Sequence, residues 1–142
     1  MSPVKQAVLL SAGFGSRLKE ITHGKIPKVM APLGGKPLLE HHLEQFSRYG
    51  VTEFFVNLHH LPDAIRDYFG DGARWGVKIT YTLEKNILGT AGGVKNFEGA
   101  LDDAFFVIYG DIFSLVDYDR MQKSFSEKPN HAIGMELIGE TD

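Results

Sequence analysis

The chain has 142 residues, of which 43% are hydrophobic and 23% charged, a composition typical of one globular domain with a sizeable core. Its net charge of -3 at pH 7 excludes proteins that bind nucleic acid through bulk positive charge. The absence of cysteine excludes disulfides and thiolate metal sites, and it agrees with a reducing cytosol. The first apolar run is about six residues long, too short for a signal peptide or a membrane span. We therefore expect a cytoplasmic protein that binds neither nucleic acid nor a membrane.

The first predicted element is a buried parallel strand over residues 6–11, where a continuous apolar run ends in a glycine loop. The loop contains Gly13 and Gly15 and is followed by Arg17. Glycines let the backbone approach an anion closely, consecutive N–H groups can form an anion nest, and a guanidinium group suits phosphate oxygens. The connection over residues 12–37 is long, and loops of this length are usually functional or mobile. The pattern predicts a site for a triphosphate.

Strands and helices alternate along the rest of the chain. Further strands are predicted at residues 53–58, 77–83, 104–109 and 132–138. Helices are predicted from Pro37 to near Gly50, at residues 62–69, through Val94, Phe97 and Leu101, and after an N-cap at Asp117. The strand at 77–83 alternates apolar and polar residues and belongs near a sheet edge, whereas the strand at 104–109 reads as buried. We predict an α/β fold with an open, mostly parallel, Rossmann-like sheet and helices on both faces.

In such sheets, ligands bind beyond the carboxyl ends of the strands. Three of the predicted loops begin there: the glycine loop, residues 88–90 and residues 110–111. We expect them to converge on one site.

Two other glycine-loop motifs fit less well. A dinucleotide-binding fingerprint needs a third glycine at position 18, which is Leu18. A Walker A loop needs Ser or Thr after Gly-Lys, but Ile26 and Pro37 follow the two Gly-Lys pairs. A Rossmann-type oxidoreductase is therefore the weaker alternative.

Three segments stand out near the N-terminus: Ser-Ala-Gly-Phe-Gly-Ser-Arg-Leu at residues 11–18, Pro-Lys at 27–28 and Gly-Lys-Pro-Leu at 35–38. Together they resemble the signature of the sugar-1-phosphate nucleotidyltransferases, or NDP-sugar pyrophosphorylases, with Ser11 where that family usually has alanine. Further matches follow in order at residues 50–53, 68–72, 75–79, 88–93 and 109–111. The loop at 88–93 looks like the sugar-specific branch, mannose-1-phosphate guanylyltransferase-like. Relatives that load choline phosphate share the opening signature, so the acceptor stays open.

The resemblance implies Mg²⁺-dependent transfer of a nucleoside monophosphate from an NTP to a sugar 1-phosphate, which gives an NDP-sugar and pyrophosphate. It also implies roles for three side chains: Arg17 holds the departing pyrophosphate, Lys28 neutralises charge near the α-phosphate, and Asp111 holds Mg²⁺. The implied nucleotide-binding residues are Leu10, Ser11, Ala12, Gly13, Phe14, Gly15, Ser16, Arg17, Lys28, Glu84, Leu88, Gly89 and Thr90.

The family's catalytic domain continues well beyond residue 142, so we expect residues 1–142 to form a single nucleotidyltransferase-like domain that is truncated at its C-terminal end. The second metal ligand and the sugar-phosphate lysine have no counterpart here, because Glu136 and Asp142 lie in no matching motif. The neighbouring His59 and His60 point opposite ways on a strand and do not predict a metal site. A non-catalytic nucleotide- or NDP-sugar-binding module remains an alternative function. The base, the sugar and a homo-oligomeric state are left open.

Overall fold

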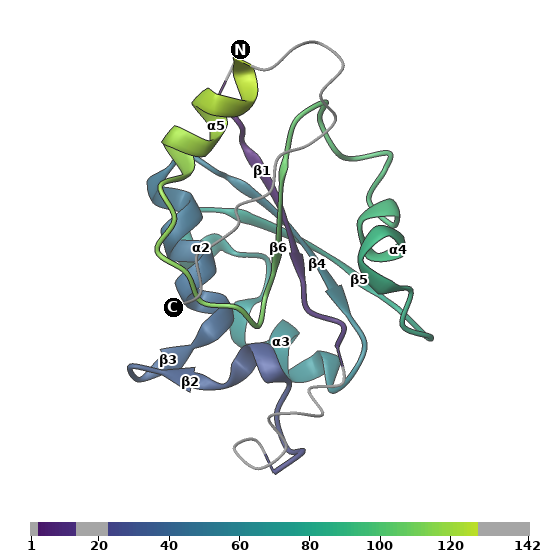
Figure 1. Ribbon diagram of the computed structural model, residues 1–142. Coiled ribbons are helices and arrows are strands. Elements are labelled where there is room, and N and C mark those ends of the chain that lie inside the picture. The colour runs from purple at the N-terminus through teal and green to yellow at the C-terminus, as the bar shows by residue number, and fades with distance from the viewer. Residues whose placement is uncertain (1–2, 14–22, 128–142) are drawn as a thin grey trace, which may run out of the picture.

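The computed structural model describes residues 3–13 and 23–127 of the chain. Its centre is a four-stranded sheet with the strand order β5-β4-β1-β6 (Figure 1). The strands are β1 (Gln6–Leu10), β4 (Glu53–Leu58), β5 (Lys78–Leu83) and β6 (Phe106–Tyr109). All pairings between these neighbours are parallel, which confirms the predicted open α/β sheet. The strand predicted at residues 132–138 lies outside the described residues.

The register of the sheet brings the ends of the four strands together. Leu10 of β1 lies opposite Asn57 of β4 and Tyr109 of β6. Asn57 is in turn opposite Thr82 of β5. Because parallel strands run the same way, the loops that follow all four strands begin at one edge of the sheet.

One face of the sheet shares a hydrophobic core with three helices: α2 (Leu38–Arg48), α3 (Pro62–Phe69) and α5 (Tyr118–Ser126). Leu39, Leu43 and Phe46 recur along one side of α2 and are almost completely buried. The Phe46 ring stacks on Tyr118 of α5, with 4.2 Å between the ring centroids. The predicted start of α5 is confirmed, because the Asp117 side chain accepts a backbone N–H of the first turn.

The opposite face carries α4 (Gly89–Lys95) and a smaller cluster in which Val8, Phe55 and Phe97 are buried. Figure 1 shows α4 across the sheet from α2 and α5, so the prediction of helices on both faces is confirmed. The helix predicted through Val94, Phe97 and Leu101 is displaced toward the N-terminus, since α4 already begins at Gly89, in the predicted loop, and ends at Lys95. Glycines are unfavourable inside helices by about 1 kcal/mol each, which is why this glycine-rich stretch reads as a loop in the sequence. Within the described residues, no helix combines the length and the apolarity that a membrane crossing would require.

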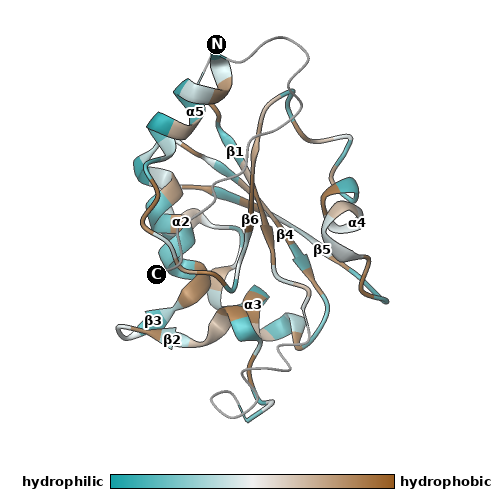
Figure 2. Ribbon diagram, in the orientation of Figure 1, coloured by the Kyte–Doolittle hydropathy of each residue, from teal (hydrophilic) through white to brown (hydrophobic). Residues whose placement is uncertain are grey.

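The edge position of β5 was predicted correctly, whereas the burial of β6 was not. β5 lies at one edge, as its alternating pattern predicts. β6 is the other edge of the described sheet, and Figure 2 shows that most of it is hydrophobic. Val107 and Tyr109 are nevertheless 45% and 49% exposed, which corrects the prediction that the strand is buried. An apolar run predicts a strand, but it does not predict how fully each face is covered.

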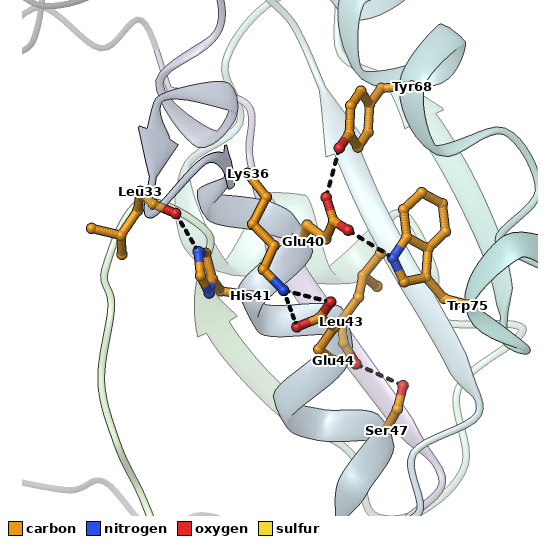
Figure 3. Close-up of polar contacts among 9 residues, drawn as sticks. All are labelled: Leu33, Lys36, Glu40, His41, Leu43, Glu44, Ser47, Tyr68 and Trp75. Carbon is orange, nitrogen blue, oxygen red and sulfur yellow. Dashed lines mark hydrogen bonds and ion pairs between the residues drawn. The ribbon is translucent and has the colours of Figure 1, made fainter.

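The described part of the connection before α2 contains regular secondary structure, although the sequence predicts a loop there. It contains a 3-10 helix, η2 (Lys28–Met30), and a small antiparallel hairpin of β2 (Pro32–Leu33) and β3 (Lys36–Pro37). Figure 3 shows two contacts that fix this hairpin to α2. Lys36 Nζ lies 2.6 and 2.7 Å from the two carboxylate oxygens of Glu44, and His41 Nε2 lies 2.7 Å from the Leu33 backbone oxygen. These contacts fix the hairpin, which follows η2 in the chain, to α2.

Glu40 of α2 is a buried carboxylate that is satisfied by two aromatic donors (Figure 3). It accepts the Tyr68 hydroxyl at 2.7 Å and Trp75 Nε1 at 3.2 Å. Tyr68 belongs to α3, and Trp75 ends the 3-10 helix η3 (Ala73–Trp75). Trp75 is partly buried and also packs on Phe69, with 5.1 Å between the ring centroids. These contacts join α2 to α3 and to the turn before β5.

His42 of α2 gives folding stability a pH dependence of known sign. Its side chain is fully buried, and burial lowers its pKa below the ordinary value of 6.5, with backbone groups of Gly110 and Ile112 offsetting this only in part. The unfolded chain therefore takes up this proton at a higher pH than the folded chain, so protonation favours unfolding. We expect the free energy of unfolding to fall as the pH drops below 6.5. Urea unfolding between about pH 8 and about pH 5 measures this slope.

The matched variants for this measurement are His42→Gln and His41→Gln. The first should lose the part of the slope that begins at 6.5, while the second should keep most of it, because burial lowers the His42 pKa more than the neighbouring charge of His41 does. An unchanged slope in His42→Gln would show that His42 is not the group responsible.

Candidate active site

A pocket of about 200 Å³ lies at the carboxyl ends of the strands. Its lining residues end or follow each strand of the sheet, or come from η2: Leu10, Ser11, Ala12, Gly13, Lys28, Val29, Asn57, Glu84, Ile87, Gly89, Thr90, Tyr109 and Asp111. The loops that follow β1, β5 and β6 meet here, which confirms their predicted convergence.

Most of the predicted nucleotide-binding residues are part of this lining. They are Leu10, Ser11, Ala12, Gly13, Lys28, Glu84, Gly89 and Thr90, and the predicted metal ligand Asp111 lies beside them. Leu88 is held next to the pocket through its backbone N–H, which donates to Glu84 Oε2 at 3.1 Å. The predicted residues Phe14, Gly15, Ser16 and Arg17 lie outside the described residues.

Lys28 and Asp111 form an ion pair in the pocket, although they are 83 positions apart in the sequence. Lys28 comes from η2, and Asp111 follows β6. Their side chains are 23% and 29% exposed, so both charges can be reached from solvent. An ammonium and a carboxylate at one end of a pocket offer a cation for phosphate oxygens and an oxygen ligand for a hard metal ion.

Gly110 explains why Lys28 and Asp111 can approach each other. A Cβ atom at this position would lie 2.9 Å from both Ser11 Oγ and a methyl carbon of Val29. Only a residue without a side chain lets the loop after β6 pass this close to the end of β1 and to η2. Its backbone N–H also donates to the Leu10 carbonyl at 2.9 Å, which extends the pairing of β6 with β1.

Asn57 is a pocket residue that the sequence analysis missed. Its Oδ1 accepts the Ser11 backbone N–H at 2.7 Å, and its Nδ2 donates to Glu84 Oε1 at 2.9 Å. Glu84 is one of the predicted nucleotide-binding residues, and both of its carboxylate oxygens accept hydrogen bonds from within the protein. The available signal was an amide near the end of an apolar strand, where a polar residue needs a partner.

Two further contacts shape the walls of the pocket. The Thr90 hydroxyl lies 2.9 Å from the Tyr109 hydroxyl, which links the first turn of α4 to the end of β6. His59 Nδ1 lies 2.7 Å from the Glu84 backbone oxygen, so this histidine ties the end of β4 to the end of β5.

Comparisons with known proteins agree with this arrangement. The family model described as nucleotidyl transferase matches residues 6–141. A UTP–glucose-1-phosphate uridylyltransferase from Synechocystis sp. is 42% identical over 126 residues, which cover 80% of this chain and 32% of that protein. A mannose-1-phosphate guanylyltransferase from Mycobacterium tuberculosis is 34% identical over 125 residues, which cover 83% of this chain and 34% of that protein. The crystal structure of HddC from Yersinia pseudotuberculosis complexed with GMP-PN has a TM-score of 0.76 and 31% identity, and the match covers 87% of this chain and 55% of that chain.

The chain therefore spans about a third of the length of these two curated relatives. The family model nevertheless covers nearly the whole chain, and the relatives carry the names that the opening signature predicts. This chain belongs to the nucleotidyl transferase family, among relatives named as sugar-1-phosphate nucleotidyltransferases.

Proposed function

We propose that this chain forms the nucleotide-binding part of a sugar-1-phosphate nucleotidyltransferase. The reaction joins a nucleoside monophosphate from an NTP to a sugar 1-phosphate and releases pyrophosphate. The observation that carries the proposal is the pairing of Lys28 with Asp111 in a pocket that Glu84, Gly89 and Thr90 also line. A cation and a carboxylate suited to a metal-bound polyanion thus share one pocket with predicted nucleotide-binding residues.

The chemistry of the reaction explains why cations matter more than a base here. An oxygen of the sugar phosphate is already ionised when it attacks the α-phosphorus, so no proton has to be removed first. The bond from the α-phosphorus to the bridging oxygen breaks, and that oxygen leaves with the pyrophosphate. Lys28 would lower the repulsion between the two anions and hold them in line.

Asp111 fits Mg²⁺ that arrives with a triphosphate. Mg²⁺ usually keeps several waters and binds proteins through one or two carboxylates together with substrate phosphates. Within the described residues, no group of three or more acidic or histidine side chains could hold a metal ion without a substrate. Asp111 would hold the ion, whose positive charge would offset the negative charge of the phosphate groups.

Arg17 is the proposed partner of the departing pyrophosphate, and its loss should weaken binding. We expect Arg17→Ala to reduce the binding free energy of Mg·NTP by on the order of 1.5–3 kcal/mol, because a charged hydrogen-bond donor to phosphate is removed. Isothermal titration calorimetry measures this change. Arg120→Ala, an exposed arginine on α5, removes the same charge and should bind as the wild type does. Equal affinity of Arg17→Ala and the wild type would remove Arg17 from the site.

The proposed reaction is tested by measuring pyrophosphate release. Each of GTP, UTP, dTTP, ATP and CTP is combined with glucose 1-phosphate, mannose 1-phosphate or choline phosphate in the presence of Mg²⁺. We expect release that requires both an NTP and a sugar 1-phosphate. Release with choline phosphate instead would favour the phosphocholine cytidylyltransferase-like alternative. NTP binding without release from any pair would favour a non-catalytic binding module.

The cytoplasmic location stays part of this proposal and is supported by the lack of cysteine.

A further inference from the structure

Asn57 sits between two polar groups that belong to different walls of the pocket. It is the penultimate residue of β4 and is only 3% exposed. On one side its carbonyl oxygen accepts the N–H of Ser11, where the glycine loop begins. On the other side its NH₂ group donates to the carboxylate of Glu84, which follows β5.

Glu84 carries this link on to the next loop. The carboxylate is 4% exposed, and such a buried acid is tolerated when several donors satisfy it. Its Oε1 also accepts Asn96 Nδ2 at 3.3 Å, and its Oε2 accepts the Leu88 backbone N–H at 3.1 Å. The chain of bonds therefore runs from Ser11 through Asn57 and Glu84 to Leu88, which directly precedes Gly89 and Thr90.

The hydrogen bonds made at position 57 require an amide side chain. The group at 57 must accept from a backbone N–H at one end and donate to a carboxylate at the other, which one amide does with its two different atoms. Aspartate would place two carboxylates against each other, and leucine would leave the Ser11 N–H and Glu84 without a partner. The surroundings are also close-fitting: a Cβ on Gly93 would lie 2.7 Å from Asn57 Nδ2 and 3.3 Å from Glu84 Oε1.

We propose that Asn57 is a positioning residue that sets the distance between Ser11, at the start of the glycine loop, and residues 88–90, and thereby the affinity of the pocket for a nucleotide. The inference rests on the proposed function, because the nucleotide is the ligand that would span the two loops. Asn57 acts through Ser11 and Glu84, whose backbone and carboxylate it holds. Loss of the link should weaken Mg·NTP binding by about 10- to 100-fold, the usual effect of removing a partner that orients a binding group.

The test exchanges the two chemical groups instead of only removing them. Asn57→Asp places two carboxylates together, and Glu84→Gln sets an NH₂ group against either Asn57 Nδ2 or the Leu88 N–H. The double variant Asn57→Asp/Glu84→Gln has the charge of the wild type and restores a donor facing an acceptor between positions 57 and 84, and the Asn96 amide can turn its oxygen toward the new NH₂ group. Both single variants should bind Mg·NTP more weakly than the double variant does. Asn86→Asp, an exposed residue of the same loop, adds a charge without touching the link and should bind as the wild type does.

Two measurements read the outcome: the Kd by calorimetry, and hydrogen exchange of the Ser11 and Leu88 amides by NMR. Recovery of both affinity and amide protection in the double variant is the expected result. The proposal is overturned if Asn57→Asp binds as the wild type does, or if the double variant binds no better than the weaker single variant while thermal unfolding shows it folded. If the wild type binds no NTP, the proposed function fails, and hydrogen exchange of the Ser11 and Leu88 amides then tests the link through Asn57 by itself. Amide protection that is lost in Asn57→Asp and regained in the double variant upholds the link. Unchanged amide protection overturns it.

Discussion

Lys28→Ala should lower the rate of pyrophosphate release by on the order of 10²- to 10³-fold, the usual cost of removing one donor that stabilises developing charge. Lys28 supplies a positive charge at the end of the pocket that also holds Asp111. Without the Lys28 charge, less of the repulsion between the triphosphate and the sugar phosphate would be neutralised. Initial rates at saturating NTP and sugar 1-phosphate measure the effect.

The fold itself should tolerate this substitution. Lys28 and Asp111 are both partly exposed, and an ion pair of that kind contributes at most about 1 kcal/mol to stability. Lys25→Ala is the matched control, because Lys25 is an exposed lysine three positions earlier on the same connection. If Lys25→Ala and Lys28→Ala lowered the rate equally, bulk charge and not the position of Lys28 would explain the loss.

Asp111→Asn should abolish the response to Mg²⁺. The substitution keeps the shape of the side chain but removes the charge that makes a carboxylate a good ligand for a hard cation. In the wild type, we expect Mg²⁺ to increase both NTP affinity and turnover, and in the variant we expect neither to depend on the metal. Titrations of NTP binding at a series of Mg²⁺ concentrations measure this, with Mn²⁺ as a second metal.

Asp103→Asn provides the comparison, since Asp103 is an exposed acid in the turn before β6. This variant should respond to Mg²⁺ as the wild type does. A full metal response in Asp111→Asn would remove Asp111 as the metal ligand and leave the Lys28 pairing as its only role in the pocket.

Local sequence pattern predicts the elements of this fold well where the pattern is strong. β4 and α3 have the predicted bounds, because an apolar run of strand length and a proline at the first helical position are local signals. The alternation of strands and helices likewise predicts which loops meet at the pocket. Position along the chain and parallel strand direction are enough for that prediction.

Features that depend on contacts between distant residues could not be predicted in the same way. Asn57 is a single amide in an apolar strand, and its partners Ser11 and Glu84 are 46 and 27 positions away. The hairpin before α2 depends on Lys36 pairing with Glu44 of that helix, which no short motif predicts. The exposure of β6 depends on what covers the sheet, and strand propensity does not encode this.

The central claim is that the pocket at the carboxyl ends of the strands binds a nucleoside triphosphate. Calorimetric titration of the chain with GTP, UTP, dTTP, ATP and CTP, each with Mg²⁺, tests it most directly. We expect saturable binding of one NTP per chain, with a clear preference for one base and a loss of affinity in Lys28→Ala. Absence of saturable binding for all five nucleotides would contradict the claim.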